Sequence, residues 1–312
     1  MVHQHSRSQL LIARARALGP VPTAVVYPCS RDALAGAMQA HAAGLITPIL
    51  IGPRARISDI AAAEKIGLGS CDIEDVEEPV AAAQRAAAMV GEGRVEALMK
   101  GSLHTDELMS VIVSRAAGLR TARRLSHVFV MDVPGHDRLL LITDAAVNIA
   151  PDLKVKADIV RNAIDVAHAI GIAEPRIALL SAVETVNPGI PSTVDAAALR
   201  EMAQRGEISG GILDGPLAFD NAISAEAARI KGISWPVSGK VDILVVPALE
   251  AGNILYKSLV YLGGAVAAGV VLGARVPVIL TSRADSPESR TASAAVACLI
   301  AHERRQTKTI KK

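Results

Sequence analysis

The sequence is poor in aromatic residues: its 312 residues include one Trp, three Tyr and two Phe, although 51% are hydrophobic. The core must therefore be built from Ala, Val, Ile and Leu, which is typical of parallel strands buried beneath helices. With so few aromatics there is no platform on which nucleic-acid bases could stack. Because 33 Lys and Arg balance 31 Asp and Glu, the excess of cations that holds a polyanion is also missing. We expect no nucleic-acid partner.

Cysteines are few, odd in number and far apart, at Cys29, Cys71 and Cys298. This spacing forms neither a disulfide framework nor a metal-ligand cluster, and the eight histidines are scattered singly, so we expect no metal site. Free thiols are typical of a reducing compartment. The first apolar run, Leu10 to Ala13, is shorter than the apolar part of a secretory signal. We therefore expect a cytoplasmic location.

Long hydrophobic runs are missing as well. The longest uncharged apolar stretch, Leu259 to Ala274, has 16 residues and four glycines, whereas a membrane-spanning helix needs about 20 residues. We expect this stretch to be buried protein interior and the protein to have no membrane partner.

What the sequence does contain is an alternation of strand-length apolar runs with helix-length, alanine-rich segments. Up to residue 115 it predicts strands at 23–27, 47–51 and 95–99, and helices at 31–43, 56–66 and 104–115. Such an α/β alternation predicts a mostly parallel sheet with helices on both faces.

Two strand-like runs, 127–133 and 138–143, then flank the turn sequence Pro134-Gly135-His136-Asp137 and predict an antiparallel hairpin at the entrance to a second domain. The alternation resumes after the hairpin, and the basic tail 304–312 is expected to be a solvated end. The further strands are expected at 176–181, 210–213, 241–246, 270–272 and 277–280, and the further helices at 152–170, 194–205, 221–231, after Gly252 and at 287–302.

Polar residues and glycines follow several of these strands, at the carboxyl ends where ligands gather in parallel sheets. The clearest case is the segment 281–288, in which Arg283 precedes Ser286-Pro287, a pair typical of a helix N-cap and the first helical residue. Backbone N–H groups, the helix dipole and a guanidinium that converge in this way predict a phosphate site. Ordinary capping with a surface arginine is the alternative.

Four further strand ends carry candidate binding residues, for which helix caps and solvated side chains are the structural alternatives. Carboxylates that follow two of these strands, together with Asp285, indicate a shared cleft. The four segments are Lys100-Gly101-Ser102 with His104, Thr143-Asp144 with Asn148, Asp214 with Asp220, and Asn253 with Lys257. The phosphate-binding and dinucleotide-binding glycine motifs, the zinc-protease motif and the G-x-S-x-G elbow are absent.

Together these segments resemble the phosphate acetyl/butyryltransferase family from about residue 20 to 300, and are more similar to its phosphate butyryltransferase branch. The motifs that carry the resemblance, in chain order, are Lys100-Gly101 with His104-Thr105, Leu119-Arg120-Thr121 with Leu125-Ser126-His127, Thr143-Asp144-Ala145-Ala146-Val147-Asn148, Asp214-Gly215-Pro216-Leu217 with Asp220-Asn221-Ala222, Ala251-Gly252-Asn253 with Tyr256-Lys257, and Thr281-Ser282-Arg283-Ala284-Asp285-Ser286.

The resemblance implies a short-chain phosphate acyltransferase, which interconverts acyl-CoA plus orthophosphate with acyl phosphate plus CoA. It implies CoA or acyl-CoA as substrate, no tightly bound cofactor, and a homodimer or higher homo-oligomer. The fold it implies has two α/β domains of the isocitrate/isopropylmalate dehydrogenase type with the active site in the cleft between them. We place these domains at 1–130 plus 284–312 and at 131–283.

The resemblance also implies site residues. Ser282, Arg283 and Asp285 are the expected catalytic residues; Arg283 grips the phosphoryl group and Ser282 donates a hydrogen bond. The expected substrate-binding residues are Lys100, Gly101, His104, Thr143, Asp144, Asn148, Asp214, Asp220, Asn253, Lys257 and Ser286.

One departure from the family pattern concerns the general base. Where the acetyltransferase branch has an aspartate, seven residues after the serine, this chain has Ser289, with Glu288 beside it. Asp285, Glu288 or Asp144 are the candidates for the base, and we expect an acyl preference somewhat longer than acetyl.

Two alternatives remain from other functional classes. One is a divalent-metal-dependent NAD(P) dehydrogenase of related fold, with Asp144, Asp214 and Asp220 as metal ligands. The other is a catalytically silent CoA-binding homologue, suggested by the missing aspartate.

Overall fold

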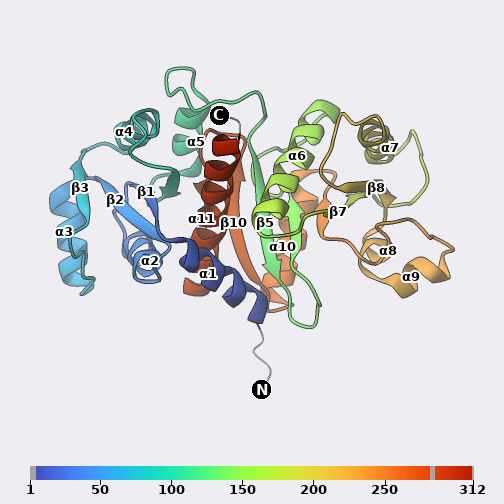
Figure 1. Cartoon of the computed structure of the whole chain (residues 1–312), viewed down its shortest axis with the longest axis horizontal. Coiled ribbons are helices and arrows are strands. Elements are labelled where there is room, and N and C mark those ends of the chain that lie inside the picture. Colours follow the sequence, from blue (N-terminus) through green and yellow to red (C-terminus); the bar gives the residue numbers. More distant parts are fainter. Residues whose placement is uncertain (1–4, 282–284, 311–312) are drawn as a thin grey trace. The chain divides into compact units, whose positions relative to one another are not determined.

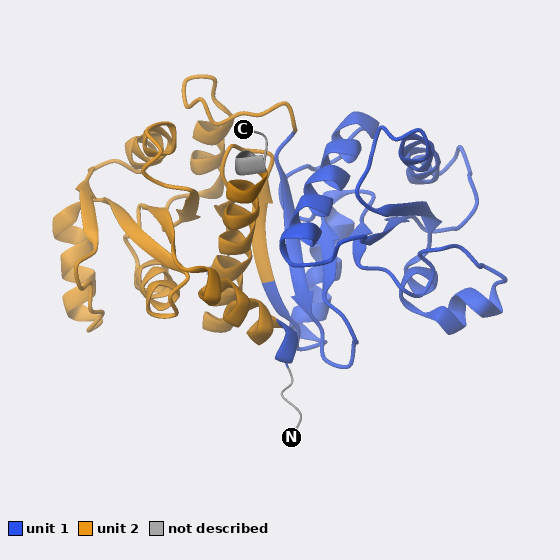
Figure 2. Cartoon of the chain, viewed as in Figure 1, with its two compact units in different colours: residues 1–7, 124–267 blue, residues 8–123, 268–312 orange. Residues whose placement is uncertain are grey.

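The chain has an α/β fold in which mostly parallel strands lie between helices (Figure 1). The structure is a computed structural model and describes residues 5–281 and 285–310, with side chains as far as residue 307. It divides into two compact units (Figure 2): unit 1 comprises residues 1–7 and 124–267, and unit 2 comprises residues 8–123 and 268–312. The domain boundaries that the resemblance implies stay a prediction.

The strands of unit 2 pair in parallel, with one antiparallel exception. Its strand order is β3-β2-β1-β4-β11-β10, and only the β10–β11 pair is antiparallel. Val25 at the centre of β1 faces Leu50 of β2 and Met99 of β4. The strands are β1 (Val21–Val26), β2 (Ile46–Gly52), β3 (Asp72–Asp75), β4 (Ala97–Lys100), β11 (Val278–Ile279) and β10 (Val266–Leu272), whose first two residues belong to unit 1.

Helices cover both faces of this sheet, as the alternation predicted. Helices α4 (Pro79–Gly91) and α5 (Thr105–Val113) pack together on one face, and α2 (Arg31–Ala42) and α11 (Pro287–Ile310) pack together on the other (Figure 1). Helix α3 (Arg54–Ala63) lies beside α2 and β3. Most of α1 (Ser6–Leu18) also belongs to unit 2, where the Cys298 thiol of α11 donates to the Ala15 carbonyl.

Three elements were not predicted, and one helix is longer than predicted. Helix α1, strand β3 and helix α4 escaped notice, because α1 and β3 are polar and α4 buries mainly alanines. The last helix, expected at 287–302, continues as α11 to Ile310, and Gln306 and Thr307, in the segment expected to be a solvated end, are exposed. The Arg305 guanidinium binds the Glu96 carboxylate at 2.7 Å. This ion pair with a residue far away in the sequence helps to hold the basic end of α11.

Unit 1 contains five strands in the order β5-β6-β9-β7-β8. The predicted hairpin is confirmed: β5 and β6 are antiparallel, with Val130 opposite Leu141, and the remaining pairs are parallel. The strands are β5 (Ser126–Asp132), β6 (Leu140–Thr143), β7 (Arg176–Leu180), β8 (Ile212–Leu217) and β9 (Ile243–Val245).

Helices also surround the sheet of unit 1. Helices α6 (Leu153–Ala169) and α7 (Pro191–Gln204) pack against each other on one side (Figure 1). The helix predicted at 221–231 is in fact two short helices, α8 (Phe219–Ile223) and α9 (Ala225–Ile230), because the Ser224 hydroxyl caps α9 by accepting from the Ala227 N–H. Helix α10 (Leu249–Tyr261) starts before Gly252 rather than after it.

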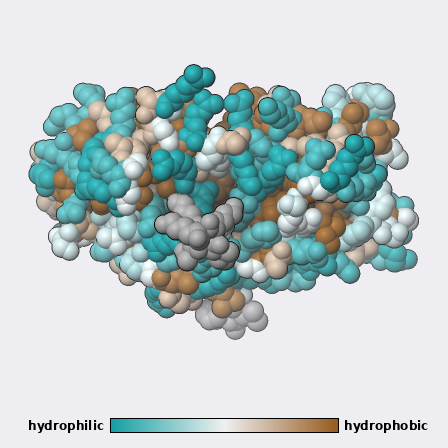
Figure 3. All heavy atoms as spheres, turned by 45° about the horizontal axis from the view of Figure 1, so that its top comes forward, coloured by the Kyte–Doolittle hydropathy of each residue, from teal (hydrophilic) through white to brown (hydrophobic). Residues whose placement is uncertain are grey.

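The core of unit 1 is aliphatic with a small aromatic contribution, as the composition predicted. Met131, Ile142 and Leu244 are fully buried, and the rings of Phe129 and Tyr256 stack with centroids 3.9 Å apart. Within the described residues, no helix is both long and apolar enough to cross a membrane. Hydrophilic residues occupy much of the face drawn in Figure 3, with hydrophobic residues between them.

The cysteines yield a test of this packing. Burial raises the pKa of the Cys298 thiol to about 11 and also raises the pKa of the buried Cys29. Because the thiolate is the reactive form, we expect Ellman's reagent at pH 8 to modify the half-buried Cys71 first and Cys298 last. Peptide mapping by mass spectrometry measures the order, and Cys71→Ser removes the fast phase. Equal rates for Cys71 and Cys298 in native protein would contradict the packing.

Candidate functional site

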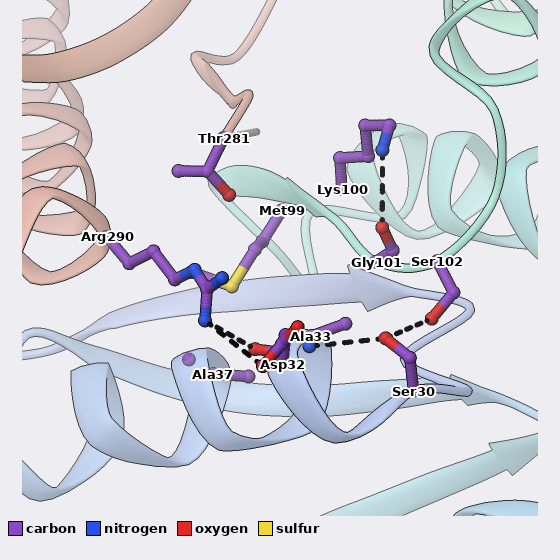
Figure 4. A pocket seen from close by; sticks show the side chains of 11 residues that line it. Ser30, Asp32, Ala33, Ala37, Met99, Lys100, Gly101, Ser102, Thr281 and Arg290 are labelled. Carbon is purple, nitrogen blue, oxygen red and sulfur yellow. Dashed lines mark hydrogen bonds and ion pairs between the residues drawn. The ribbon is translucent and has the colours of Figure 1, made fainter. Parts of the chain in front are cut away.

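The carboxyl ends of β1, β4 and β11 in unit 2 surround a pocket with an empty volume of about 490 Å³, open solvent included (Figure 4). It lies at strand ends, where the sequence predicted candidate binding residues. The lining combines two cations, Lys100 and Arg290, with three hydroxyl side chains. The residues around it are Ser30, Asp32, Ala33, Gly36, Ala37, Met99, Lys100, Gly101, Ser102, Thr281 and Arg290.

Gly101 forms one wall of this pocket by a close approach of two backbones. Its N–H donates to the Val26 carbonyl, and the Ser102 N–H donates to the Tyr27 carbonyl, both at 2.8 Å. A Cβ at Gly101 would lie 2.3 Å from the Val26 carbonyl oxygen, closer than atoms can approach. Glycine is therefore required here for the β4 end to run alongside the β1 end.

Helix α2 begins at the pocket. The Ser30 hydroxyl is its N-cap and accepts from the Ala33 N–H, while the Ser102 hydroxyl donates to Ser30 at 2.9 Å. From α11, the Arg290 guanidinium donates to the Asp32 carbonyl at 3.2 Å (Figure 4). The positive end of the helix dipole and two cations lie around one space together with the Asp32 carboxylate, which is 4.0 Å from the Arg290 guanidinium. Two cations against one carboxylate leave the lining positive, which favours an anionic ligand.

Sequence reasoning missed Ser30, Asp32 and Arg290 as pocket residues. A signal was present for Ser30, since it follows the strand predicted at 23–27 and precedes a helix, like the strand ends that were singled out. No signal marked Arg290, because its side chain comes from a helix far along the chain.

The segment that resembles the catalytic motif is described only in part. Ser282 and Arg283 lie outside the described residues, whereas Thr281 before them lines the pocket. The predicted cap is confirmed: α11 begins at Pro287, and the Ser286 hydroxyl accepts from the Ser289 N–H at 3.1 Å.

The candidates for the general base differ in their surroundings. Asp285 is half-buried, and Glu288 accepts a hydrogen bond from the Gln9 amide at 3.1 Å. Ser289, at the position of the family aspartate, is buried. His104 is exposed at the start of α5, where its N–H donates to Glu107, and its substrate-binding role stays a prediction.

In unit 1, Asp144 follows strand β6 as predicted and organises the loop after it. Its carboxylate accepts from the backbone N–H groups of Ala146, Val147 and Asn148 and from the Asn148 side chain at 2.6 Å. Asp144 is 3% exposed. With both oxygens engaged in this way, its position suits the support of a loop better than proton transfer.

The loop has two further anchors. The Thr143 hydroxyl donates to the His127 carbonyl of β5 at 2.8 Å, and the Asn148 side chain donates to the Leu125 carbonyl at 2.8 Å. Three of the predicted binding residues, Thr143, Asp144 and Asn148, are therefore brought together, and their side chains mainly hold the backbone in place.

Helix α10 adds a fourth predicted residue to this loop. The Asn253 amide donates to the Ala145 carbonyl at 3.2 Å, and Gly252 lies so close to Ala145 that a Cβ there would come within 2.8 Å of the Ala145 Cβ. Lys257 is exposed one turn further along α10, so its role in substrate binding stays a prediction.

The remaining two predicted aspartates of unit 1, Asp214 and Asp220, have other partners than the loop after β6. Asp214 lies within β8 rather than after a strand, because the strand continues to Leu217, and its carboxylate accepts from the Gly215 N–H at 2.8 Å. Asp220 pairs with Lys231 at 3.0 Å, and this ammonium lowers the pKa of the Asp220 carboxyl. Asp144, Asp214 and Asp220, all of them described residues, form no metal-binding group.

Comparison with known proteins gives consistent results. The family model "Phosphate acetyl/butaryl transferase" matches residues 60–298. A phosphate acetyltransferase of Rhizobium meliloti is 61% identical over 97% of this chain and 96% of its own length. A phosphate butyryltransferase of Clostridium beijerinckii is 42% identical over 93% of this chain and 96% of its own.

Solved structures agree with these sequence matches. A branched-chain phosphotransacylase from Enterococcus faecalis V583 superimposes with a TM-score of 0.77 at 33% identity, over 90% of this chain and 99% of that one. A 4-hydroxythreonine-4-phosphate dehydrogenase from Burkholderia phymatum reaches 0.55 at 14% identity, over 90% and 98% of the two chains. The second likeness concerns the fold alone.

Gly101 is open to a direct test. In Gly101→Ala the new methyl group meets the Val26 and Tyr27 carbonyls, so we expect the free energy of unfolding to fall by about 1–3 kcal/mol and the pocket to be distorted. Urea denaturation measures the change. Gly91→Ala is the matched control, because no atom lies within 4 Å of its added Cβ. Equal stabilities of the two variants would contradict the close approach.

The loop after β6 can be tested through Asp144. In Asp144→Asn one oxygen becomes an amide that faces backbone N–H donors, so we expect a loss of about 1–3 kcal/mol of stability. Asp59→Asn, at an exposed position on α3, is the control and should change stability by less than about 0.5 kcal/mol. A neutral effect of Asp144→Asn in urea denaturation would show that the loop does not depend on the carboxylate.

Proposed function

Because the chain belongs to the phosphate acetyl/butyryltransferase family, we propose that it is a phosphate acyltransferase, which interconverts acyl-CoA plus orthophosphate with acyl phosphate plus CoA. The acyl group is short, butyryl or acetyl. CoA and acyl-CoA are substrates, and no tightly bound cofactor takes part.

One structural observation carries this proposal: the pocket beside Thr281 in unit 2. Lys100, Arg290 and the amino end of α2 line it, and each favours a negatively charged group. The residue after Thr281 is Ser282, the first residue of the motif that resembles the family's catalytic pair. A phosphate or acyl phosphate bound in this pocket would lie beside Thr281, the residue that precedes this pair in the sequence.

The chemistry follows from the charges that develop during acyl transfer. The CoA thiolate attacks the acyl carbon of acyl phosphate, the C–S bond forms, and the carbonyl oxygen becomes an oxyanion. Collapse of this tetrahedral intermediate breaks the C–O bond and releases orthophosphate. Fixed donors aimed at the oxyanion supply the largest rate acceleration; we assign this role to Ser282 and the grip on the phosphoryl group to Arg283.

The thiol needs a base, since its pKa of about 8.5 leaves it mostly protonated at neutral pH. We assign this role to Asp285. Asp285 stands two residues after Arg283 in the segment that resembles the family's catalytic motif, and Ser289, at the position of the family aspartate, has no carboxylate. In the reverse direction, the protonated Asp285 returns its proton to the CoA sulfur as orthophosphate attacks the acyl-CoA.

The remaining parts of the proposal rest on the family resemblance. We propose that the two units act as isocitrate/isopropylmalate dehydrogenase-like domains and contribute residues to one active site, Thr143, Asn148 and Asn253 from unit 1. A homodimer and a cytoplasmic location complete the proposal, the latter supported by three free cysteines. The dehydrogenase alternative is not favoured, because its three aspartates are not gathered.

The test is a phosphate-dependent assay of CoA release over acyl chains from acetyl to valeryl. We expect free thiol only when phosphate is present, with the highest kcat/KM for a chain somewhat longer than acetyl. Arg283→Ala should lower kcat/KM by about a hundred- to a thousandfold. Arg205→Ala, at the exposed C-cap of α7 and paired with Glu201, is the control and should retain activity.

Other outcomes identify the alternatives. CoA binding without turnover, with binding unchanged in Arg283→Ala, favours the silent homologue. A requirement for magnesium together with a change in NAD absorbance favours the dehydrogenase. Thiol release that does not depend on phosphate contradicts acyl transfer to phosphate.

A further inference from the structure

The pocket of unit 2 has an apolar part that the binding of phosphate does not use. Besides its cations and hydroxyl groups, the lining includes Ala33, Gly36, Ala37 and Met99. Met99 is a buried residue of β4, and Figure 4 shows its side chain extending from the strand toward α2. Neither a methyl group nor a thioether donates a hydrogen bond. These side chains therefore contribute nothing to holding an anion.

The polarity of the lining changes along α2. The N-cap Ser30 and the neighbouring Ser102 carry hydroxyl groups that are joined by a hydrogen bond, whereas Ala33, Gly36 and Ala37 follow within the helix. Positions i, i+3 and i+4 share one face of a helix, and all three line the pocket. The pocket therefore has a polar end at the amino terminus of α2 and an apolar side along the helix.

Arg290 joins the two parts of the pocket. A Cβ at Gly36 would lie 3.1 Å from the Arg290 Cδ, so the aliphatic stem of this arginine runs over α2 where residue 36 has no side chain. Its guanidinium continues to the Asp32 carbonyl at 3.2 Å. One side chain thus presents apolar surface beside Gly36 and a positive charge at its tip.

An acyl phosphate has the same combination of properties, because its negatively charged phosphoryl group and its short hydrocarbon chain belong to one small molecule. We propose that the acyl chain of the substrate lies against Ala33, Ala37 and Met99, and that Ala33 and Met99 set the longest chain the enzyme accepts. Lys100 and Arg290 bind the phosphoryl group of the same molecule. This proposal rests on the proposed function and deepens it, since it names the residues that select the acyl group.

The lining suits a chain longer than acetyl. Alanine and glycine on α2 leave open the space that larger side chains would fill, and methionine is unbranched and adapts to a neighbouring chain. Each methylene group that leaves water for such a surface should strengthen binding about fourfold. Butyryl phosphate, which is longer than acetyl phosphate by two methylenes, should therefore bind about tenfold more tightly.

Two substitutions with opposite effects test the assignment in the phosphate-dependent assay of CoA release. Ala33→Val adds two methyl groups to the pocket and should lower the ratio of kcat/KM for valeryl-CoA to that for acetyl-CoA by at least about tenfold. Met99→Ala removes most of a side chain and should raise the same ratio about tenfold. The ratio is informative because a general loss of folding or activity lowers kcat/KM for every chain alike.

Matched controls make the same changes away from the pocket. Ala35→Val places the same valine on α2, at a half-buried position that is not among the described residues lining the pocket. Met89→Ala removes a methionine that is fully buried in α4. Both should leave the chain-length ratio at the wild-type value. Far-ultraviolet circular dichroism and thermal melting verify that every variant is folded.

Binding without turnover gives a second readout. The probes are acetonylphosphonate and its homologue with a butyryl chain, in which CH₂ replaces the bridging oxygen of an acyl phosphate. In calorimetry without CoA, wild type should bind the longer probe about tenfold more tightly than the shorter one, and Ala33→Val should abolish this preference. Because CoA is absent, its pantetheine arm cannot account for the difference.

Several results would overturn the proposal. An active wild type whose chain-length ratio is unchanged in both Ala33→Val and Met99→Ala does so, and so does equal affinity for the two probes. An Ala33→Val variant with a raised KM for CoA and an unchanged ratio would assign the apolar surface to the pantetheine arm instead. A wild type that releases no thiol in the presence of phosphate would refute the proposed function itself, so the activity of wild type distinguishes the two failures.

Discussion

The close approach of two backbone turns at the carboxyl end of a parallel sheet is the constraint on which the rest of unit 2 depends. The N–H groups of Gly101 and Ser102 reach the carbonyls of Val26 and Tyr27, which continues the pairing of β1 and β4 beyond the strands themselves. Only a residue without a Cβ permits this. The pocket beside α2 is lined by residues that follow both strand ends, Ser30 after β1 and Gly101 and Ser102 after β4.

In unit 1, side chains rather than a close approach of two backbones hold the segment that follows a strand. The loop after β6 is held by the Asp144 carboxylate, which collects three backbone N–H groups, and by Thr143 and Asn148, which reach neighbouring carbonyls. These three residues match binding residues of the family, and their side chains hydrogen-bond to the backbone around the loop. Their spacing in the sequence is the spacing that fixes the conformation of this loop, and it is the loop that substrate would meet.

Local patterns predicted the elements that are apolar and periodic. The strands near Val25, Leu50 and Met99, and the hairpin around Gly135, were found because their burial demands aliphatic runs and a turn between them. The polar edge strand β3 and the alanine helix α4 carry weaker patterns, since neighbours rather than their own hydrophobicity hold them. Asp214 was misplaced for a related reason: a register shift lets β8 continue past a carboxylate.

The sequence by itself determined the fold class, three isolated cysteines that form no disulfide, and a family whose motifs stand in order along most of the chain. The tertiary structure alone decided which residues share a space. Arg290 donates to the carbonyl of Asp32, which is 258 residues away in the sequence. Arg305, near the end of α11, binds the Glu96 carboxylate. Such contacts depend on packing between elements that are distant in the sequence, so no local pattern of residues predicts them.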